Sequence, residues 1–420
     1  MDLFTIVTIL IVLAAIFGYI NVRYLKLPGT IGLMVIAIIF TTMIIISGYF
    51  SDTLYAFEHS LVEQIDFHDV LMDVMLSFLL FAGALHTNFD QLKVQRYPIL
   101  IFATFGVVVS TFLVGTMVFY LMQFLGYPVA YLYCLLFGAL ISPTDPIAVL
   151  GILKNANVPK KLETKIVGES LFNDGIGVVV FLTLMNIAKS ETGEIHVSEI
   201  AFLFVKEVFG GIAMGFALGY IAYWLMKTID DYAAEIMITL ALVTGGYLLA
   251  NTLHLSGPLT VVVAGLIVGH DTVRAATMSE ITEQYVDKFW QLVDEFLNAI
   301  LFVLIGLEIM ILTFNLNFLI AGILCIPIIL LARFSSLAFP IGYFKEKLDF
   351  VPYTNIIMTW GGLRGGISIA LALSLTATME RDLFVTITYM VVVFSIIVQG
   401  LTVGKLVKRL TKEEKVEIQT

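Results

Sequence analysis

Long apolar runs follow one another along this chain, separated by short polar segments. A helix that crosses a membrane needs about 20 predominantly apolar residues, within a range of about 17–25. Thirteen runs meet or approach this length, and they predict an all-α polytopic membrane protein. In chain order the runs are Phe4–Ile20, Thr30–Tyr49, Val70–Leu85, Pro98–Leu125, Ala130–Leu153, Ile166–Ala188, Ile200–Met226, Ala234–Leu253, Pro258–Gly269, Phe289–Phe314, Leu316–Pro340, Thr354–Ala377 and Leu383–Val407.

Composition supports the same class of protein. Hydrophobic residues make up 59% of the 420 residues and charged residues 13%, with a mean hydropathy of +0.98. Soluble domains average about 45–50% apolar and about 25% charged residues. The first run lacks the basic segment and cleavage site of a signal peptide, so we expect a retained first helix. Cys134 and Cys325 fall inside apolar runs, which supports neither a disulfide nor a thiolate metal site.

Basic residues are distributed unevenly between the two sides that thirteen helices would define. One set of alternate loops, together with the C-terminus, holds 19 of the 23 Lys and Arg residues. The other set holds three, and Arg364 lies within a run. Because cytoplasmic loops carry the excess of basic residues, we predict an external N-terminus and a cytoplasmic C-terminus. The acidic loop at 52–69 would then be external.

A weak internal repeat relates the two halves of the chain. FLLFAGALH at Phe78–His86 is similar to ILFVLIGLE at Ile300–Glu308, 222 residues later. The polar break around Asp145 has a counterpart 219 residues later around Arg364. Chance similarity among Leu-, Phe- and Gly-rich segments is the competing explanation.

The repeat predicts the domain organisation. Secondary transporters are often built from inverted repeats whose broken helices meet at an ion site near the bilayer midplane. We therefore predict two six-helix repeats, at about 4–188 and 234–407, joined by a linker helix at 200–226. Residues 408–420 would form a short cytoplasmic tail.

The fifth run carries an aspartate between two prolines. In the segment Ser142–Pro146, SPTDP, each proline removes a backbone donor, so the helix should unwind. A charge at membrane depth costs roughly 3 kcal/mol or more, so it marks a function or a partner. Freed carbonyls, the Thr144 hydroxyl and the Asp145 carboxylate are hard oxygen ligands that suit an alkali cation. A proline kink with Asp145 paired to a basic group is the competing interpretation.

The sixth run carries a second intramembrane aspartate. Ser170 and Asp174 lie one turn apart on one helix face, so both can point into one cavity. Glu169 and Asn173 share the adjacent face, where Asn173 could instead serve helix–helix hydrogen bonding. Arg364 is the basic residue that the runs place deep in the membrane. Since a buried unpaired Glu or Arg is unfavourable, we predict a structural Glu169–Arg364 ion pair.

Four further polar residues are candidates for the ion pathway. His86 and Glu308 stand near the ends of their runs, so we expect both at the membrane interface. Glu295 and Asn298 could line the bundle or face the interface.

Three stretches, SPTDPIAVL, GESLFNDG and GGLRGGISIAL, resemble the signatures of the cation–proton antiporter 1 family, the NhaP and NHE sodium–proton exchangers. LLFAGALH and FLNAILFVLIGLE are similar to the third and tenth helices of that family. The resemblance extends from about Phe4 to Val407. It implies a homodimer with 13 helices per protomer, in which a six-helix core bundle moves against a dimerisation domain. It also implies that helices five and twelve are unwound where they cross.

The resemblance also implies roles for individual residues. Asp174 would be the carboxylate that binds ion and proton, and Asn173 the asparagine of an Asn-Asp pair. Thr144, Asp145 and Ser170 would be Na⁺ ligands or close neighbours of the ion.

The same resemblance makes Glu169–Arg364 a bridge between helices six and twelve, in agreement with the pairing argued above. Some relatives carry an acid where His86 stands, and that acid lies near the ion. The contribution of the third helix is therefore open here.

From these residues we expect Na⁺ or Li⁺ to be exchanged for H⁺ by alternating access. One titrating carboxylate beside Asn173 favours one proton per cation, hence electroneutral exchange. We expect no enzymatic activity, no cofactor beyond the transported ions and no nucleic-acid partner. The protein would lie in the lipid bilayer of a prokaryotic cell, in its (inner) membrane.

Three other functions compete with this one. A K⁺/H⁺ antiporter of the same fold would use the same oxygen ligands in a slightly wider cavity. A cation channel is disfavoured by the inverted halves and by the lack of a pore-lining carbonyl loop. An intramembrane hydrolase with Ser170 as nucleophile would need a base within reach, and the candidate histidines stand near the ends of the runs.

Overall fold

The computed structural model describes residues 3–48, 67–145, 160–189, 197–312, 315–344, 350 and 353–417, and the fold is that of these residues. Their regular structure is helical throughout the described ranges. The first half contains α1 (Leu3–Ile20), α2 (Gly29–Gly48), α4 (Phe67–Asp69), α5 (Leu76–Leu85), α6 (Phe89–Val94), α7 (Arg96–Ile101), α8 (Val107–Phe124), α9 (Tyr131–Ile141) and α11 (Lys160–Lys189).

The second half is also helical. It contains α12 (Val197–Met226), α13 (Tyr232–Thr252), α14 (Gly257–Val268), α15 (Asp271–Thr277), α16 (Glu280–Leu307), α17 (Leu316–Phe344), α18 (Thr354–Gly361), α19 (Gly366–Leu373), α20 (Arg381–Phe394) and α21 (Gly400–Glu417). Short π-helical segments connect α4 to α5, α7 to α8 and α20 to α21.

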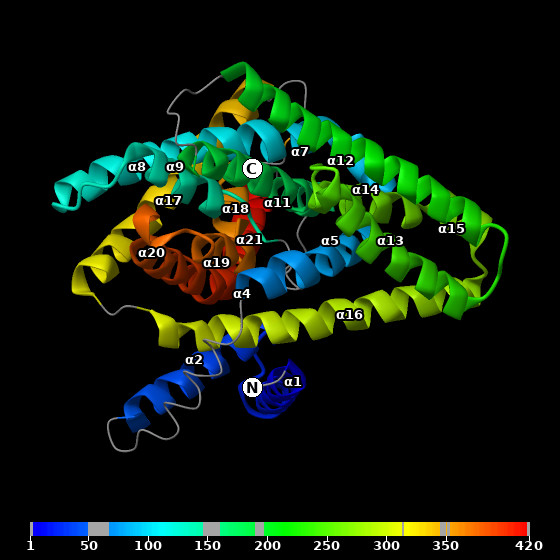
Figure 1. Ribbon diagram of the computed structural model, residues 1–420, viewed down its shortest axis with the longest axis horizontal. Helices are drawn as coiled ribbons and strands as arrows, with labels where there is room; N and C mark the ends of the chain where they lie inside the picture. Colours follow the sequence, from blue (N-terminus) through cyan, green and yellow to red (C-terminus); the bar gives the residue numbers. More distant parts are fainter. Residues whose placement is uncertain are drawn as a thin grey trace.

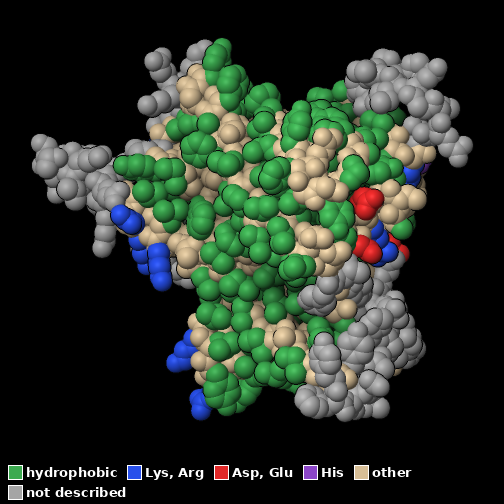
Figure 2. Space-filling model, turned by 90° about the vertical axis from the view of Figure 1, so that its left-hand side faces the viewer, with side chains coloured by type: hydrophobic (Ala, Val, Ile, Leu, Met, Phe, Trp, Pro, Cys, Tyr) green, Lys and Arg blue, Asp and Glu red, His purple; other side chains and the backbone are tan. Residues whose placement is uncertain are grey.

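The prediction of an all-α polytopic membrane protein is confirmed. Nine described helices are long and apolar enough to cross a membrane, or eleven when each of two bent pairs counts as one span. α9 is a shorter apolar helix, and the last part of its run, at 146–153, lies outside the described residues. Residues 49–66, which hold most of the predicted acidic loop, lie outside them as well. Figure 2 shows a face covered mainly by hydrophobic side chains, with charged side chains gathered at its edges, as suits contact with lipid.

The helices form two groups with α11 between them. α5, α12, α13 and α14 pack together at one end of the molecule, and α8, α17 and α20 pack at the other (Figure 1). α11 contacts α9 on one side and both α12 and α14 on the other. The long α16 runs across both groups and contacts α1, α2, α5 and α19.

Small residues allow the helices around the site to approach closely. A Cβ placed on Gly138 of α9 would lie 2.3 Å from the backbone oxygen of Thr111 in α8. Such a contact is impossible, so only glycine permits this spacing of α8 and α9. Close packing through small residues is the usual way in which membrane helices gain contact, because lipid is as apolar as the side chains.

Two helices are broken at the centre of the molecule. α9 ends at Ile141, and the chain continues as Ser142–Asp145 without helical structure. α18 and α19 are bent by 53° at a break that holds Arg364. The backbone N–H of Asp145 donates to the carbonyl oxygen of Leu363 at 2.8 Å, so the two breaks lie against each other. The unwinding predicted in helix twelve is confirmed, as is the break at Pro143 in helix five.

Candidate functional site

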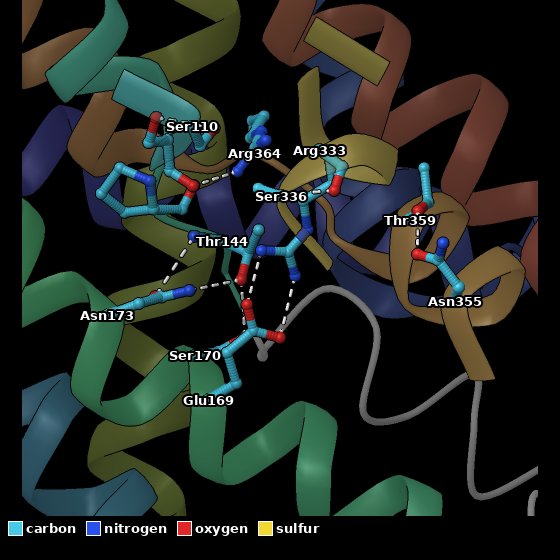
Figure 3. A network of polar contacts seen from close by, with 12 residues as sticks. Ser110, Thr144, Glu169, Ser170, Asn173, Arg333, Ser336, Asn355, Thr359 and Arg364 are labelled. Atoms are coloured by element: carbon cyan, nitrogen blue, oxygen red, sulfur yellow. Dashed lines mark hydrogen bonds and ion pairs between the residues drawn. The ribbon is translucent and has the colours of Figure 1, made fainter. Parts of the chain in front are cut away.

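Arg364 closes the broken end of α9. Its Nη1 donates to the carbonyl oxygens of Ser142 and Pro143, at 2.5 and 2.7 Å, and its backbone N–H donates to Ser395 Oγ at 2.9 Å. The last carbonyls of a helix have no partner within it and form the negative end of its dipole. A buried guanidinium therefore compensates the carbonyls that the proline break exposes. Figure 3 shows this contact beside the polar face of α11.

Thr144 is held by two residues of α11. Its hydroxyl shares a hydrogen bond with Ser170 Oγ at 2.9 Å and accepts one from Asn173 Nδ2, also at 2.9 Å (Figure 3). Its backbone N–H donates to Asn173 Oδ1 at 3.3 Å. The two-point contact gives Asn173 a positioning role between helices, as one sequence interpretation suggested. It fixes the unwound segment against the helix that carries Asp174.

Asp145 and Asp174 line one cavity of about 700 Å³. Asp174 is buried in α11, and Asp145 is half-buried in the unwound segment. A Cβ on Gly365 would lie 2.2 Å from Asp145 Oδ2, and one on Gly177 would lie 2.1 Å from Pro143 Cγ. Glycine at these two positions lets the unwound segment settle between α11 and the second break. The structure thus brings Asp145 and Asp174, the two carboxylates predicted to bind the ion, into one cavity.

The predicted Glu169–Arg364 ion pair is wrong in its arginine. Glu169 pairs with Arg333 of α17 through two contacts, Nη1–Oε1 at 2.5 Å and Nη2–Oε2 at 2.9 Å (Figure 3). Both side chains are almost fully buried. Arg333 was counted with the basic residues of the cytoplasmic loops although it lies within the run Leu316–Pro340, and in α17 it is buried inside the bundle. Two buried arginines therefore lie beside the candidate site: Arg333 pairs with Glu169, and Arg364 bonds the carbonyls at the end of α9.

The remaining pathway candidates separate in the structure. His86 and Glu295 line the cavity, whereas Asn298 and Glu308 are not among the residues that line it. Asn298 is buried on the same face of α16 as the cavity-lining residues. Glu308, which we expected at the membrane interface, is buried inside the protein at the end of α16. His86 is exposed, and its Nδ1 lies 2.8 Å from the Ala82 oxygen, so it carries the proton of that hydrogen bond.

Sequence analysis missed Asp294, which also lines the cavity. Asn298 Nδ2 donates to its backbone oxygen and to its Oδ1, at 2.8 and 3.0 Å. The signal was present in the sequence, since Asp294 precedes Glu295 directly and lies one helical turn before Asn298.

Broken helices that cross beside two intramembrane carboxylates define the class of secondary ion transporters. The model of the family described as "Sodium/hydrogen exchanger, transmembrane" matches residues 11–409. The chain belongs to this family.

Curated relatives match over nearly the whole chain. The Na(+)/H(+) antiporter NhaP of Pseudomonas aeruginosa is 46% identical over 418 residues, which is 98% of each protein. The Na(+)/H(+) antiporter NhaH of Halobacillus dabanensis is 34% identical over 92% of this chain and 93% of that protein. Among solved structures, the sodium proton antiporter MjNhaP1 of Methanocaldococcus jannaschii covers 98% of this chain and 99% of its own, with a TM-score of 0.74 and 21% identity. That likeness shows the fold.

Proposed function

We propose that the protein exchanges Na⁺ or Li⁺ for H⁺ across the membrane through one site at Asp145 and Asp174. The observation that carries the proposal is the single cavity that both carboxylates line. The names of the full-length relatives, which are Na⁺/H⁺ antiporters, support the same substrates. Thr144 and Ser170 would supply hydroxyl oxygens to the cation, and Asn173 would hold Thr144 in place.

The charges of the site support exchange of one ion for one proton. Glu169 and Arg333 neutralise each other. Arg364 bonds backbone carbonyls, but its positive charge also acts on Asp174 and offsets one of the two aspartates. The empty site then carries one net negative charge, which is costly to move through a region of low dielectric. One Na⁺ or one H⁺ removes that charge. Both loaded forms can cross, the empty form cannot, and exchange is obligatory and electroneutral.

The cavity supports an inward-open state in an alternating-access cycle. Exposed side chains at its rim include Asn88 and Lys160, in segments that the basic-residue distribution assigns to the cytoplasm. We propose that the N-terminus is external and the C-terminus cytoplasmic. The protein would work as a homodimer in the cell (inner) membrane, with the repeats at 4–188 and 234–407 and the linker helix at 200–226. It would need no cofactor and catalyse no chemical reaction.

Transport by the full chain in proteoliposomes tests the proposal. A pH-sensitive dye inside acidified vesicles should dequench when Na⁺ or Li⁺ is added outside, because cation entry drives protons out. K⁺ added in a third arm tests the K⁺/H⁺ alternative. The matched control is Asp174→Asn, which keeps the size of the side chain but cannot release a proton. Wild-type vesicles that respond to none of the three cations, or no better than the control vesicles, would overturn the proposal.

A further inference from the structure

The cavity has a second acidic wall, formed by α16. Asp145 and Asp174 come from the fifth and sixth runs, whereas α16 contributes Gln291, Asp294 and Glu295 to the lining. Farther along α16, Leu301 also lines the cavity and packs against Gly366 at the start of α19. Asp294 stands seven residues before Leu301, which places it about 10 Å along the helix from the crossing.

The acids of α16 differ in how they are compensated. Arg274 Nη1 lies 3.1 Å from Glu283 Oε1 and 2.9 Å from Asp287 Oδ1, so these two carboxylates are paired with it. Within the described residues, neither Asp294 nor Glu295 forms an ion pair with Lys or Arg. The negative charge that α16 brings to the cavity is therefore not compensated by an ion pair with Lys or Arg among the described residues.

Asp294 is held in a defined position. Asn298 is 3% exposed, and its Nδ2 engages the Asp294 Oδ1. The Asn298 Oδ1 has no hydrogen-bond partner among the described residues. One oxygen of the Asp294 carboxylate is thus fixed by a buried amide, on a residue that lines the cavity. Glu295, by contrast, is exposed and accepts a hydrogen bond from Gln291 Nε2 at 3.0 Å.

We propose that Asp294 is a further cation-binding residue of the transport pathway. It receives the entering monovalent cation at the α16 wall of the cavity and sets the affinity for the cation, without carrying the exchanged proton. This proposal rests on the proposed exchange function. Asp294 differs from Asp174 in its expected effect, because its loss should weaken cation uptake while the site at Asp145 and Asp174 still turns over.

Kinetics of reconstituted Asp294→Asn test this role at alkaline pH, where protons compete least with Na⁺. The variant keeps the size of the side chain and an acceptor for Asn298. A unit charge about 10 Å from a cation at an effective dielectric constant of about 20 corresponds to a rise in the apparent KM for Na⁺ of roughly tenfold. The maximal rate should stay within about twofold of wild type, and Asp294→Glu should restore most of the affinity.

Asp287→Asn is the matched control, because it removes the same charge from the same helix two turns earlier. Arg274 already compensates Asp287, so the KM of this variant should change far less. An unchanged KM in Asp294→Asn, or an equal rise in both variants, would overturn the role of Asp294 while exchange by the wild type upholds the proposed function. If Asp294→Asn fails to reconstitute, Glu295→Gln alters the same wall at an exposed position. It should raise the KM in the same direction, and an unchanged KM there would count against the proposal.

Discussion

The Glu169–Arg333 ion pair joins α11 to α17, and we expect its loss to destabilise the protein rather than to change ion selectivity. The carboxylate is 1% exposed and the guanidinium 3%, and they meet through two contacts at 2.5 and 2.9 Å. Removing one partner of such a pair leaves an uncompensated buried charge, which typically costs about 3–5 kcal/mol. Glu169→Gln and Arg333→Gln should therefore each lower the melting temperature in detergent markedly.

Double variants distinguish the observed Glu169–Arg333 pair from the Glu169–Arg364 pair that the sequence predicted. Glu169→Gln with Arg333→Gln leaves two neutral amides that can bond each other, so it should melt above either single variant. Glu169→Gln with Arg364→Gln should melt below both of its single variants. Glu169 and Arg364 make different contacts, so the losses of stability from the two substitutions should nearly add.

Thermal unfolding of the five variants in one detergent, followed by intrinsic fluorescence, measures both cycles. Recovery in the Arg364 double variant equal to that in the Arg333 double variant would refute the assignment of Glu169 to Arg333. So would an Arg333 double variant that melts no higher than the worse single variant.

Three further outcomes follow from the geometry of the site. Gly365→Ala should abolish exchange in proteoliposomes, because its Cβ would lie 2.2 Å from Asp145 Oδ2, whereas Gly342→Ala, with no atom within 4 Å, should exchange normally; equal activity would refute the tight fit. Each unit of pH lost raises the concentration of competing protons about tenfold, so the apparent KM for Na⁺ should also rise about tenfold once Asp174 is mainly protonated. A KM that does not depend on pH would refute competition. Steady-state proton gradients should not change with an imposed potassium-diffusion potential, although moving one charge through 100 mV is worth about 2.3 kcal/mol; a gradient that follows the potential would mean unequal stoichiometry.

Hydrophobic patterning predicted the membrane class and the positions of the two broken helices. Prolines around Asp145 and glycines around Arg364 interrupt apolar runs, and such interruptions have a local physical cause. The same locality explains why Asp145, Ser170 and Asp174 could be singled out before their surroundings were known.

The partners of the buried charges could not be predicted in the same way. Arg364 binds the backbone carbonyls of Ser142 and Pro143, and a carbonyl has no signature in the sequence. Glu169 meets Arg333 across 164 residues of chain, so their contact depends on how α11 and α17 pack. Hydropathy reports the depth of a charge in the bilayer, whereas its partner is decided by the tertiary fold.

The central claim is that Na⁺ and H⁺ compete for one carboxylate site. The most direct measurement is the number of protons released per Na⁺ bound by the purified protein. Calorimetric titrations in buffers of different ionisation enthalpy give this number without any transport. At a pH where Asp174 is protonated, we expect close to one proton released per Na⁺, and Asp174→Asn should release none. Tight binding of Na⁺ to the wild type without proton release would contradict the shared site.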